Sequence, residues 1–304
     1  MSAIQLPESV STFLDILQQY LGLLDRHAEF VSRVDGVQTL WTYRVNGVVP
    51  ETNIMIHQTQ ESLESGAPRF RVRIGATIDG EQGSLLHGIE SIANRYCMLG
   101  ALMAHSNQTF TVGSQFIIGD GNLHTCAALS AAAAVNGVAS LLGAFSRSSS
   151  GEKPHVQQLS SWSQLDFERL QYEFAHLGDC RASDRECQVR TMWGDIGLSA
   201  VHNNPYWGGG LLVLVSTEID RLGIEGSAPV NEMNLIEWLS GDVPMFGGWS
   251  ADGKYVRFVS FLPNFMKEVD QLMGHIVSWG RGRLVGAADT VAAAIEMRAL
   301  LDNK

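Results

Sequence analysis

Two halves of the chain show the same order of apolar patterns, and this repeat limits the possible folds more than any other feature. In each half a helical period is followed by three alternating segments, a short helical segment, two more alternating segments and a long helix. The first three alternating segments are QTLWTYRV, TNIMIHQT and RFRVRIGA in one half and CQVRTMWGDI, LSAVHNN and GLLVLVSTEI in the other. Alternation indicates strands with one buried face. We therefore predict an α+β fold of two tandem domains, each an antiparallel sheet packed by helices.

A polar segment separates the two copies. Residues 146–158, SRSSSGEKPHVQQ, contain almost no apolar side chains and are rich in Ser, a composition typical of linkers and exposed loops. We predict a first domain over residues 1–148, a linker over 149–159 and a second domain over 160–304. Each domain is long enough to bury a core of its own.

The helices are predicted from apolar residues three and four positions apart. The first has the stripe Val10, Phe13, Leu14, Leu17, Leu21 and Leu24. Short helices are expected at LLHGIESIA and VNEMNLIEWLS, and a buried Ala-rich helix at 122–145. A long helix is expected from residue 262, with a pause at Gly280-Arg281-Gly282. Attraction to the C-terminal dipole of the helix before the pause explains Arg281 and Arg283 better than an anion site does.

The segment MFGGWSADGKYVRFVSFLP, residues 245–263, is predicted to form a hairpin with Gly253 in its turn. Its second strand has Val256, Phe258 and Leu262 on the face toward the helices, and Tyr255, Arg257, Val259 and Phe261 on the opposite face. Something must cover that opposite face, because contiguous apolar patches are uncommon on monomers. The first domain, a second copy of the chain and a client segment are the alternatives, and we expect the first domain. GLLVLVSTEI is likewise expected to be covered on both faces.

Several of these residues also form a family pattern. Asn234-x-x-x-Trp238, Pro244-Met-Phe-Gly-Gly-Trp249, Asp252-Gly253 and a strand closing on Phe261-Leu-Pro263 resemble the C-terminal half of YbjN-type domains, which belong with the bacterial type III secretion chaperone-like fold. The first half shares Asn94, Gly100 and the order of elements only. The resemblance implies two fused chaperone-like domains, which form either a monomeric pseudo-dimer or a homodimer, and which hold partner segments on apolar surface. Family members are also linked to regulation, and no catalytic residue is transferred.

Two strips of residues are the candidate partner-binding surfaces. Arg69, Arg71 and Arg73 alternate on one strand and form a positive stripe, which suits an acidic peptide or the other domain. A solvated strand face is the explanation that we favour for this stripe, with partner binding as the alternative. The second strip is Tyr255, Arg257, Val259 and Phe261.

The sequence contains no specific catalytic or metal-binding motif. His124 and Cys126 form the only close Cys/His pair, but on a helix their side chains diverge by about 200°. We therefore expect Cys126 to be packed structurally. Cys180 and Cys187 flank a charged loop and are interpreted as two separate thiols, with a reversible disulfide as the alternative. No histidine pair has the spacing of a zinc helix, and we expect no cofactor and no metal.

Charge and composition restrict the class of partner. The formal net charge is −11 and no run of Lys or Arg occurs, which disfavours nucleic acid and anionic lipid as partners. The N-terminus lacks a basic region before its apolar stretch, so we expect neither a signal peptide nor a membrane span, and a cytoplasmic location.

Three functional classes remain. The leading hypothesis is a non-enzymatic protein- or peptide-binding protein, chaperone-like or a regulatory adaptor. The alternative is a regulatory protein that responds to a small molecule bound in the inter-domain groove. An enzyme with a site assembled from distant residues is the third class.

Overall fold

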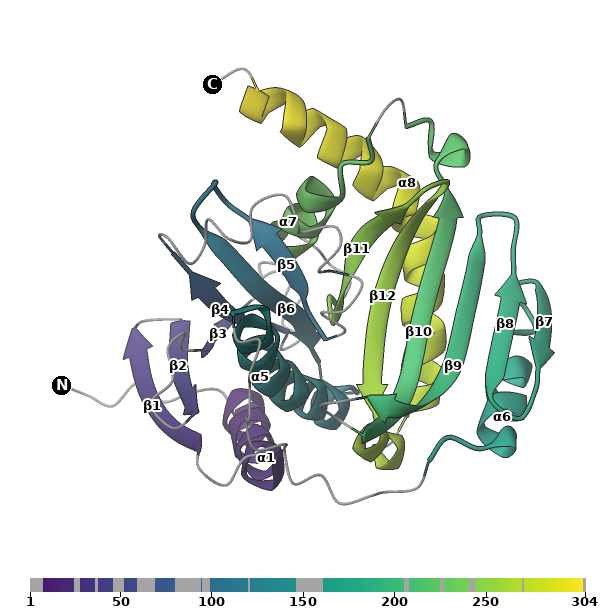
Figure 1. Cartoon of the computed structure of the whole chain (residues 1–304). Helices are drawn as coiled ribbons and strands as arrows, with labels where there is room; N and C mark the ends of the chain where they lie inside the picture. The colour runs from purple at the N-terminus through teal and green to yellow at the C-terminus, as the bar shows by residue number, and fades with distance from the viewer. Residues whose placement is uncertain are drawn as a thin grey trace.

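The computed structural model contains two six-stranded antiparallel sheets, each formed by one half of the chain (Figure 1). The predicted α+β class is thereby confirmed. The described residues are 8–24, 28–35, 38–45, 52–58, 69–79, 94, 99–119, 121–145, 161–204, 208–224, 227–240, 244–269 and 271–302. The expected linker and the expected helix LLHGIESIA lie outside these ranges.

In the first half one described helix precedes the strands along the chain and another follows them. Its elements are α1 (Glu8–Leu24), β1 (Ala28–Asp35), β2 (Gln38–Val45), β3 (Thr52–Gln58), β4 (Phe70–Ile78), β5 (Ala101–Ala104), β6 (Phe110–Ile118) and α5 (Leu123–Phe145). The predicted stripe of α1 is buried from Val10 to Leu21, because residues at this spacing share one helix face.

The second half repeats this plan. Its elements are α6 (Gln164–Phe174), β7 (Asp179–Ala182), β8 (Glu186–Arg190), β9 (Asp195–Asn204), β10 (Gly208–Glu218), the 3₁₀ helix η1 (Asp220–Leu222), α7 (Val230–Ser240), β11 (Gly247–Asp252), β12 (Tyr255–Pro263), the 3₁₀ helix η2 (Asn264–Glu268) and α8 (Leu272–Asp302). The predicted hairpin is β11–β12, and Gly253 has the positive φ of 56° that its turn requires.

The two sheets have the same strand order. They run β1-β2-β3-β4-β6-β5 and β7-β8-β9-β10-β12-β11, which confirms the predicted match between the halves. An asparagine holds the outer strand in both. The Oδ1 of Asn94 accepts from the Leu102 N–H at 2.6 Å, and its Nδ2 donates to the Leu102 carbonyl at 3.0 Å. Asn234 makes the same two bonds with Trp249, at 2.7 and 3.0 Å.

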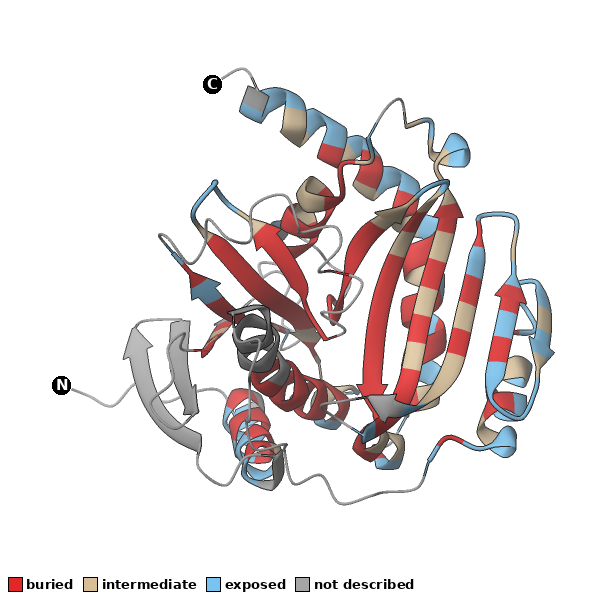
Figure 2. Ribbon diagram, viewed as in Figure 1, coloured by how far each residue is buried: buried red, intermediate tan, exposed pale blue. Residues whose placement is uncertain are grey.

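Each sheet has helices of its own half of the chain packed on one face. In the first half α5 contacts β3, β4 and β6 and is itself covered by α1. In the second half α6 lies against β7 and β8, and α8 lies behind β10 (Figure 1). Residues 126–135 of the Ala-rich helix α5 are all buried, since their small side chains allow close packing against the sheet (Figure 2). One continuous apolar cluster includes residues from both halves.

Each meander has four strands, so the expectation of three was wrong. In the second half CQVRTMWGDI contains a turn, in which the Thr191 N–H donates to the Gly194 carbonyl at 2.9 Å. This turn divides the segment into most of β8 and the start of β9, and the additional strand of this half is β7, Asp179–Ala182. In the first half the additional strand is Ala28–Asp35, where Glu29, Val31 and Arg33 alternate with smaller or apolar residues.

The long C-terminal helix also differs from the expectation. Residues 264–268 form η2, and α8 begins only at Leu272, after Gln271 with a φ of 62°. The helix then continues through Gly280-Arg281-Gly282 without the predicted pause. A Cβ at Gly280 would come within 3.0 Å of the Ile196 side chain, so this glycine allows α8 to lie close to the sheet. With no helix end at this point, the dipole explanation for Arg283 is wrong.

Candidate functional site at the junction of the two halves

Trp238 from α7 lies on the face of the first sheet that is opposite α1 and α5. Gly75 and Gly113 are paired across β4 and β6. A Cβ at Gly75 would come within 3.2 Å of the indole ring, and one at Gly113 within 2.7 Å. Trp238 is buried and packs with Met103 and Met245. Because the two glycines have no side chains, they leave room on the surface of the first sheet for the indole ring of Trp238 from the other half.

Arg73 in β4 makes one hydrogen bond within the first half and one to the second half. Its Nε donates to the Gln115 Oε1 at 3.1 Å, and its Nη2 donates to the Leu239 carbonyl at 2.5 Å. The guanidinium also lies 5.7 Å from the centre of the Trp238 ring. Burial, and then the charge of Arg71, lower the pKa of Arg73 below its ordinary value. The solvated-face explanation is therefore wrong for Arg73, which binds the other domain.

The other two arginines of the predicted stripe have different surroundings. Arg71 is half-buried, whereas Arg69, just before β4, is exposed and lines a pocket between the halves. Phe70, Val72 and Ile74 face the apolar core, as predicted from the alternation.

Backbone bonds also connect the halves. Gln115 in β6 and Met245 exchange two N–H to carbonyl bonds, at 2.8 and 2.6 Å. The side chain of Asn231 in α7 makes two bonds, of 2.8 and 3.1 Å, with the backbone of Ala104 in β5. The Asn231 bonds satisfy polar groups of the edge strand β5, and the Met245 bonds pair Gln115 beyond the end of β5. The outer strands β5 and β11 lie close together, since a Cβ at Gly248 would be 3.1 Å from that of Ala101.

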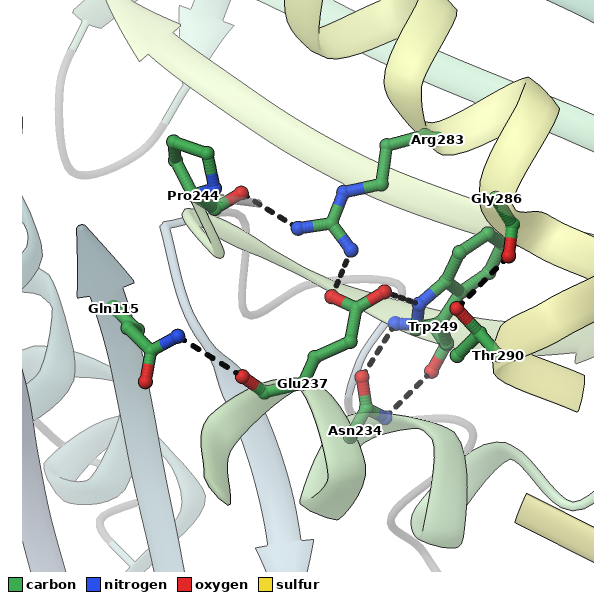
Figure 3. A network of polar contacts seen from close by, with 8 residues as sticks. All are labelled: Gln115, Asn234, Glu237, Pro244, Trp249, Arg283, Gly286 and Thr290. Atoms are coloured by element: carbon green, nitrogen blue, oxygen red, sulfur yellow. Dashed lines mark hydrogen bonds and ion pairs between the residues drawn. The ribbon is translucent and has the colours of Figure 1, made fainter. Parts of the chain in front are cut away.

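A buried ion pair between Glu237 and Arg283 lies beside this junction (Figure 3). The two side chains are 8% and 4% exposed. The Glu237 carboxylate also accepts from the Trp249 Nε1 at 2.6 Å, and Arg283 donates to the Pro244 carbonyl at 2.6 Å. The guanidinium lies 4.1 Å from the centre of the Phe258 ring. Burial lowers the pKa of Arg283 to about 9, which still leaves it charged at neutral pH.

A pocket of about 540 Å³ opens where the two halves meet. Its described lining comes from both: Arg69, Ile117, Gly119, Gly121 and Asn122 from the first half, and Pro244, His275, Ser278, Trp279 and Gly282 from the second. This volume suits a small organic ligand. The sequence analysis did not find His275 and Trp279, because a single His and Trp on a helix give no signal of a site shared with distant residues.

The second predicted strip is divided between the core and the surface. Val259 and Phe261 are buried, while Tyr255 and Arg257 are half-buried. The first half packs against this edge of the second sheet, since β5 contacts β11 and α5 contacts η2. Phe261 belongs to the apolar cluster that both halves share. In the folded chain Val259 and Phe261 are therefore core residues and are not open to a partner in solution.

The remainder of this sheet face is open among the described residues, and we call it the outer face. Strands β8, β9 and β10 alternate buried and more exposed residues along their length (Figure 2). The outer face consists of Glu186, Gln188, Arg190, Gly197, Ser199, Leu212, Leu214 and Ser216. Leu212 and Leu214 are only half-buried, so the expectation that GLLVLVSTEI is covered on both faces was wrong for them.

The sequence predicted the surroundings of Cys126 correctly and those of Cys180 and Cys187 incorrectly. Cys126 is buried in α5, and burial raises the pKa of its thiol to about 12, which agrees with a structural role. His124 is exposed. The interpretation of Cys180 and Cys187 as separate loop thiols was wrong, because they lie on the paired strands β7 and β8 with their sulfurs 3.5 Å apart. Burial raises the pKa of both thiols.

Comparison of the chain with models of protein families, with characterised proteins and with solved structures finds no match. The resemblance to YbjN-type domains therefore stays a hypothesis. Within the described ranges, no helix combines the length and apolar character needed to span a bilayer. The same residues contain no group of three or more His, Cys, Asp or Glu side chains arranged to hold a metal ion.

Proposed function

We propose that this chain is a non-enzymatic, chaperone-like or adaptor protein that binds an extended protein or peptide segment on the outer face of the second sheet. The observation that carries the proposal is the half-buried pair Leu212 and Leu214, which point away from α8. Each has a partner on β12 that is fully covered, Phe261 and Val259 respectively. Leu212 and Leu214 therefore extend the buried apolar face of β12 onto β10, where the apolar surface is partly exposed to solvent.

The surroundings of these two leucines suit a peptide. On the β9 side their neighbours are Ser199 and Gly197, whose small side chains leave the leucines accessible. Beyond them Glu186, Gln188 and Arg190 on β8 are exposed and form a polar border. An apolar centre with a polar rim is the usual anatomy of a binding surface. The matched strand order of the two halves is consistent with the proposal, since the resemblance to YbjN-type domains implies that partner segments are held on apolar surface.

Selection from a phage-displayed library of random linear peptides tests this function. Enriched peptides are synthesised, and their affinity for the purified chain is measured by fluorescence anisotropy. Leu212→Asp and Leu214→Asp should each weaken binding by about tenfold or more, because a charge then replaces an apolar contact. Gln188→Asp, which adds the same charge on the polar border, is the matched control and should change affinity little.

The melting temperature of each variant is measured alongside, so that a loss of binding is separated from a loss of folding. If the enriched peptides bind both leucine variants as tightly as the natural chain, or if no peptide is enriched, the proposed site is wrong. The alternative function, a response to a small molecule, is favoured by a different observation, the pocket between the halves.

A further inference from the structure

Cys180 and Cys187 lie together on the face of the second sheet that packs against α6. They belong to β7 and β8, at one edge of the sheet, and their sulfurs are 3.5 Å apart (Figure 1). Cys187 is fully buried, whereas Cys180 is partly exposed to solvent. The thiol of Cys126 donates instead to the Ile117 carbonyl, at 3.8 Å. Among the described cysteines, Cys180 and Cys187 are therefore the two that are placed to form a disulfide.

The register of the hairpin makes these two cysteines diagonal neighbours. Cys187 is directly opposite Ala182, and Cys180 is directly opposite Val189. Diagonal neighbours on one sheet face are about 7–8 Å apart. A relaxed disulfide joins Cα atoms that are about 4.4–6.8 Å apart. Formation of the bond must therefore draw the two strands away from their present positions.

Strand β7 is able to make this movement. It has four residues, and it lies at the edge of the sheet, where it pairs only with β8. The ion pair of Asp179 with Arg181 lies within the strand itself, at 3.2 Å. From α6, the Gln171 Nε2 donates to the Cys180 carbonyl at 3.0 Å. A short edge strand with so few bonds opens locally at a lower free energy than the core of the sheet.

We propose that Cys180 and Cys187 are a reversible redox site, which a small-molecule disulfide oxidises and a small thiol reduces. A strained disulfide is reduced more readily than a relaxed structural one, so the diagonal register suits a regulatory bond better than a permanent one. The pair faces α6, whereas the alternate residues of β8 belong to the outer face. The inference therefore does not depend on the proposed peptide binding.

The oxidation consists of two thiol–disulfide exchanges. The Cys180 thiolate attacks the small disulfide and breaks its S–S bond, which forms a mixed disulfide and releases one small thiol. The Cys187 thiolate then attacks the Cys180 Sγ, which forms the protein disulfide and releases the second small thiol. The protein loses two electrons and two thiol protons, and the small disulfide gains them. Burial raises the pKa of both thiols, so the exchange is slow until β7 opens.

Oxidation should hold the edge strand on the sheet. The new bond links β7 to β8, so β7 can no longer separate from its neighbour. Amide hydrogen exchange of residues 179–182 should slow by about tenfold or more, because closing even a short loop removes much of the freedom of the open state.

A titration with reduced and oxidised glutathione tests the site in the full chain. Free thiols are blocked at each ratio, and the products are analysed by mass spectrometry after digestion with trypsin. Trypsin cleaves after Arg181 and Arg185, so only a disulfide joins the peptides of Cys180 and Cys187. The joined peptides should appear as oxidised glutathione increases, and should disappear when reduced glutathione is added back.

A variant with both cysteines directly opposite each other tests the role of the register. Cys180→Ala combined with Ala182→Cys places the second thiol opposite Cys187, where Cα atoms are about 4.5–5.5 Å apart. This disulfide should be relaxed, so its exchange equilibrium constant with glutathione should be at least about tenfold larger than that of the natural pair. The melting temperature of the variant is measured to confirm that it folds. If it does not fold, the titration and the hydrogen exchange of the natural chain decide the question.

Four results would each overturn the proposal. The first is that the joined peptides do not appear at any glutathione ratio. The second is an exchange constant of the natural pair that equals or exceeds that of the folded variant, because the bond would then be a structural one. The third is unchanged hydrogen exchange of β7 after oxidation. The fourth is modification of Cys126 at the same rate, which would show that the chain unfolds as a whole; Cys126 is the internal control, because it is buried in α5.

Discussion

The buried pair Glu237 and Arg283 should be strongly coupled, and a double-mutant cycle measures this directly. Glu237→Gln removes the negative charge and leaves Arg283 charged in the interior, where its side chain is 4% exposed. Arg283→Met removes the positive charge and leaves the Glu237 carboxylate charged in the interior, where its side chain is 8% exposed. Leaving one partner of a buried pair without the other costs about 3–5 kcal/mol. Each single variant should therefore lose about that much unfolding free energy.

The double variant should be more stable than either single variant. With both charges removed no ion is left uncompensated, and the amide oxygen of a glutamine at 237 still accepts from the Trp249 Nε1. Methionine at 283 also fills the space over the Phe258 ring. The interaction energy of the cycle should reach about 2–3 kcal/mol.

Urea unfolding followed by circular dichroism gives the four free energies of the cycle. The exposed pair Arg221 and Glu218 is the matched control, at 2.9 Å with side chains 50% and 45% exposed. There each single change and the coupling should stay below about 1 kcal/mol. Additive effects of the Glu237 and Arg283 changes, no larger than those of the surface pair, would show that the network of Figure 3 does not hold the junction together.

Three further predictions concern the second half. Phe258→Ala should cost about 3–5 kcal/mol in thermal unfolding because the ring is 2% exposed, whereas Lys254→Ala in the exposed turn should cost under about 0.5 kcal/mol; equal small losses would mean that the burial is wrong. The pKa of Asp166 is lowered from its ordinary value of 3.8: burial alone would raise it, but hydrogen bonds from Lys267 and Ser163 outweigh that effect. Its stabilisation is therefore present above about pH 4 and lost as pH falls through the folded pKa, so Asp166→Asn should lower the melting temperature at pH 7 and not at pH 2. Diamide should oxidise Cys180 and Cys187 to one disulfide, with the two hydrogens passing to the reagent, and mass spectrometry should find a cross-linked peptide that Cys180→Ser lacks; two unlinked thiols after treatment would exclude this.

Much of the fold was predictable from local patterns. The period of α1, the alternation of β4 and the Asp-Gly turn at Gly253 depend on residues within one or two turns of each other, so the sequence alone determined them. The order of these elements predicted two similar halves, and the matched sheets confirm it. The turn at Thr191 was hidden because the residues on both sides of it have strand-like composition. Its only local signal is one glycine, which a strand also tolerates.

The site was decided by tertiary structure. Arg73 looked like part of a solvated stripe, yet it bonds to the carbonyl of Leu239, far along the chain. Arg283 looked like a surface residue near a helix end, yet its partner Glu237 comes from another helix and both are buried. Local periodicity reports which face of an element is apolar, but not which distant element covers a polar residue on it. Those partners are brought together only by tertiary packing, of the first half against the second for Arg73 and of α7 against α8 within the second half for Arg283, because only then do their charges lose water and require a partner.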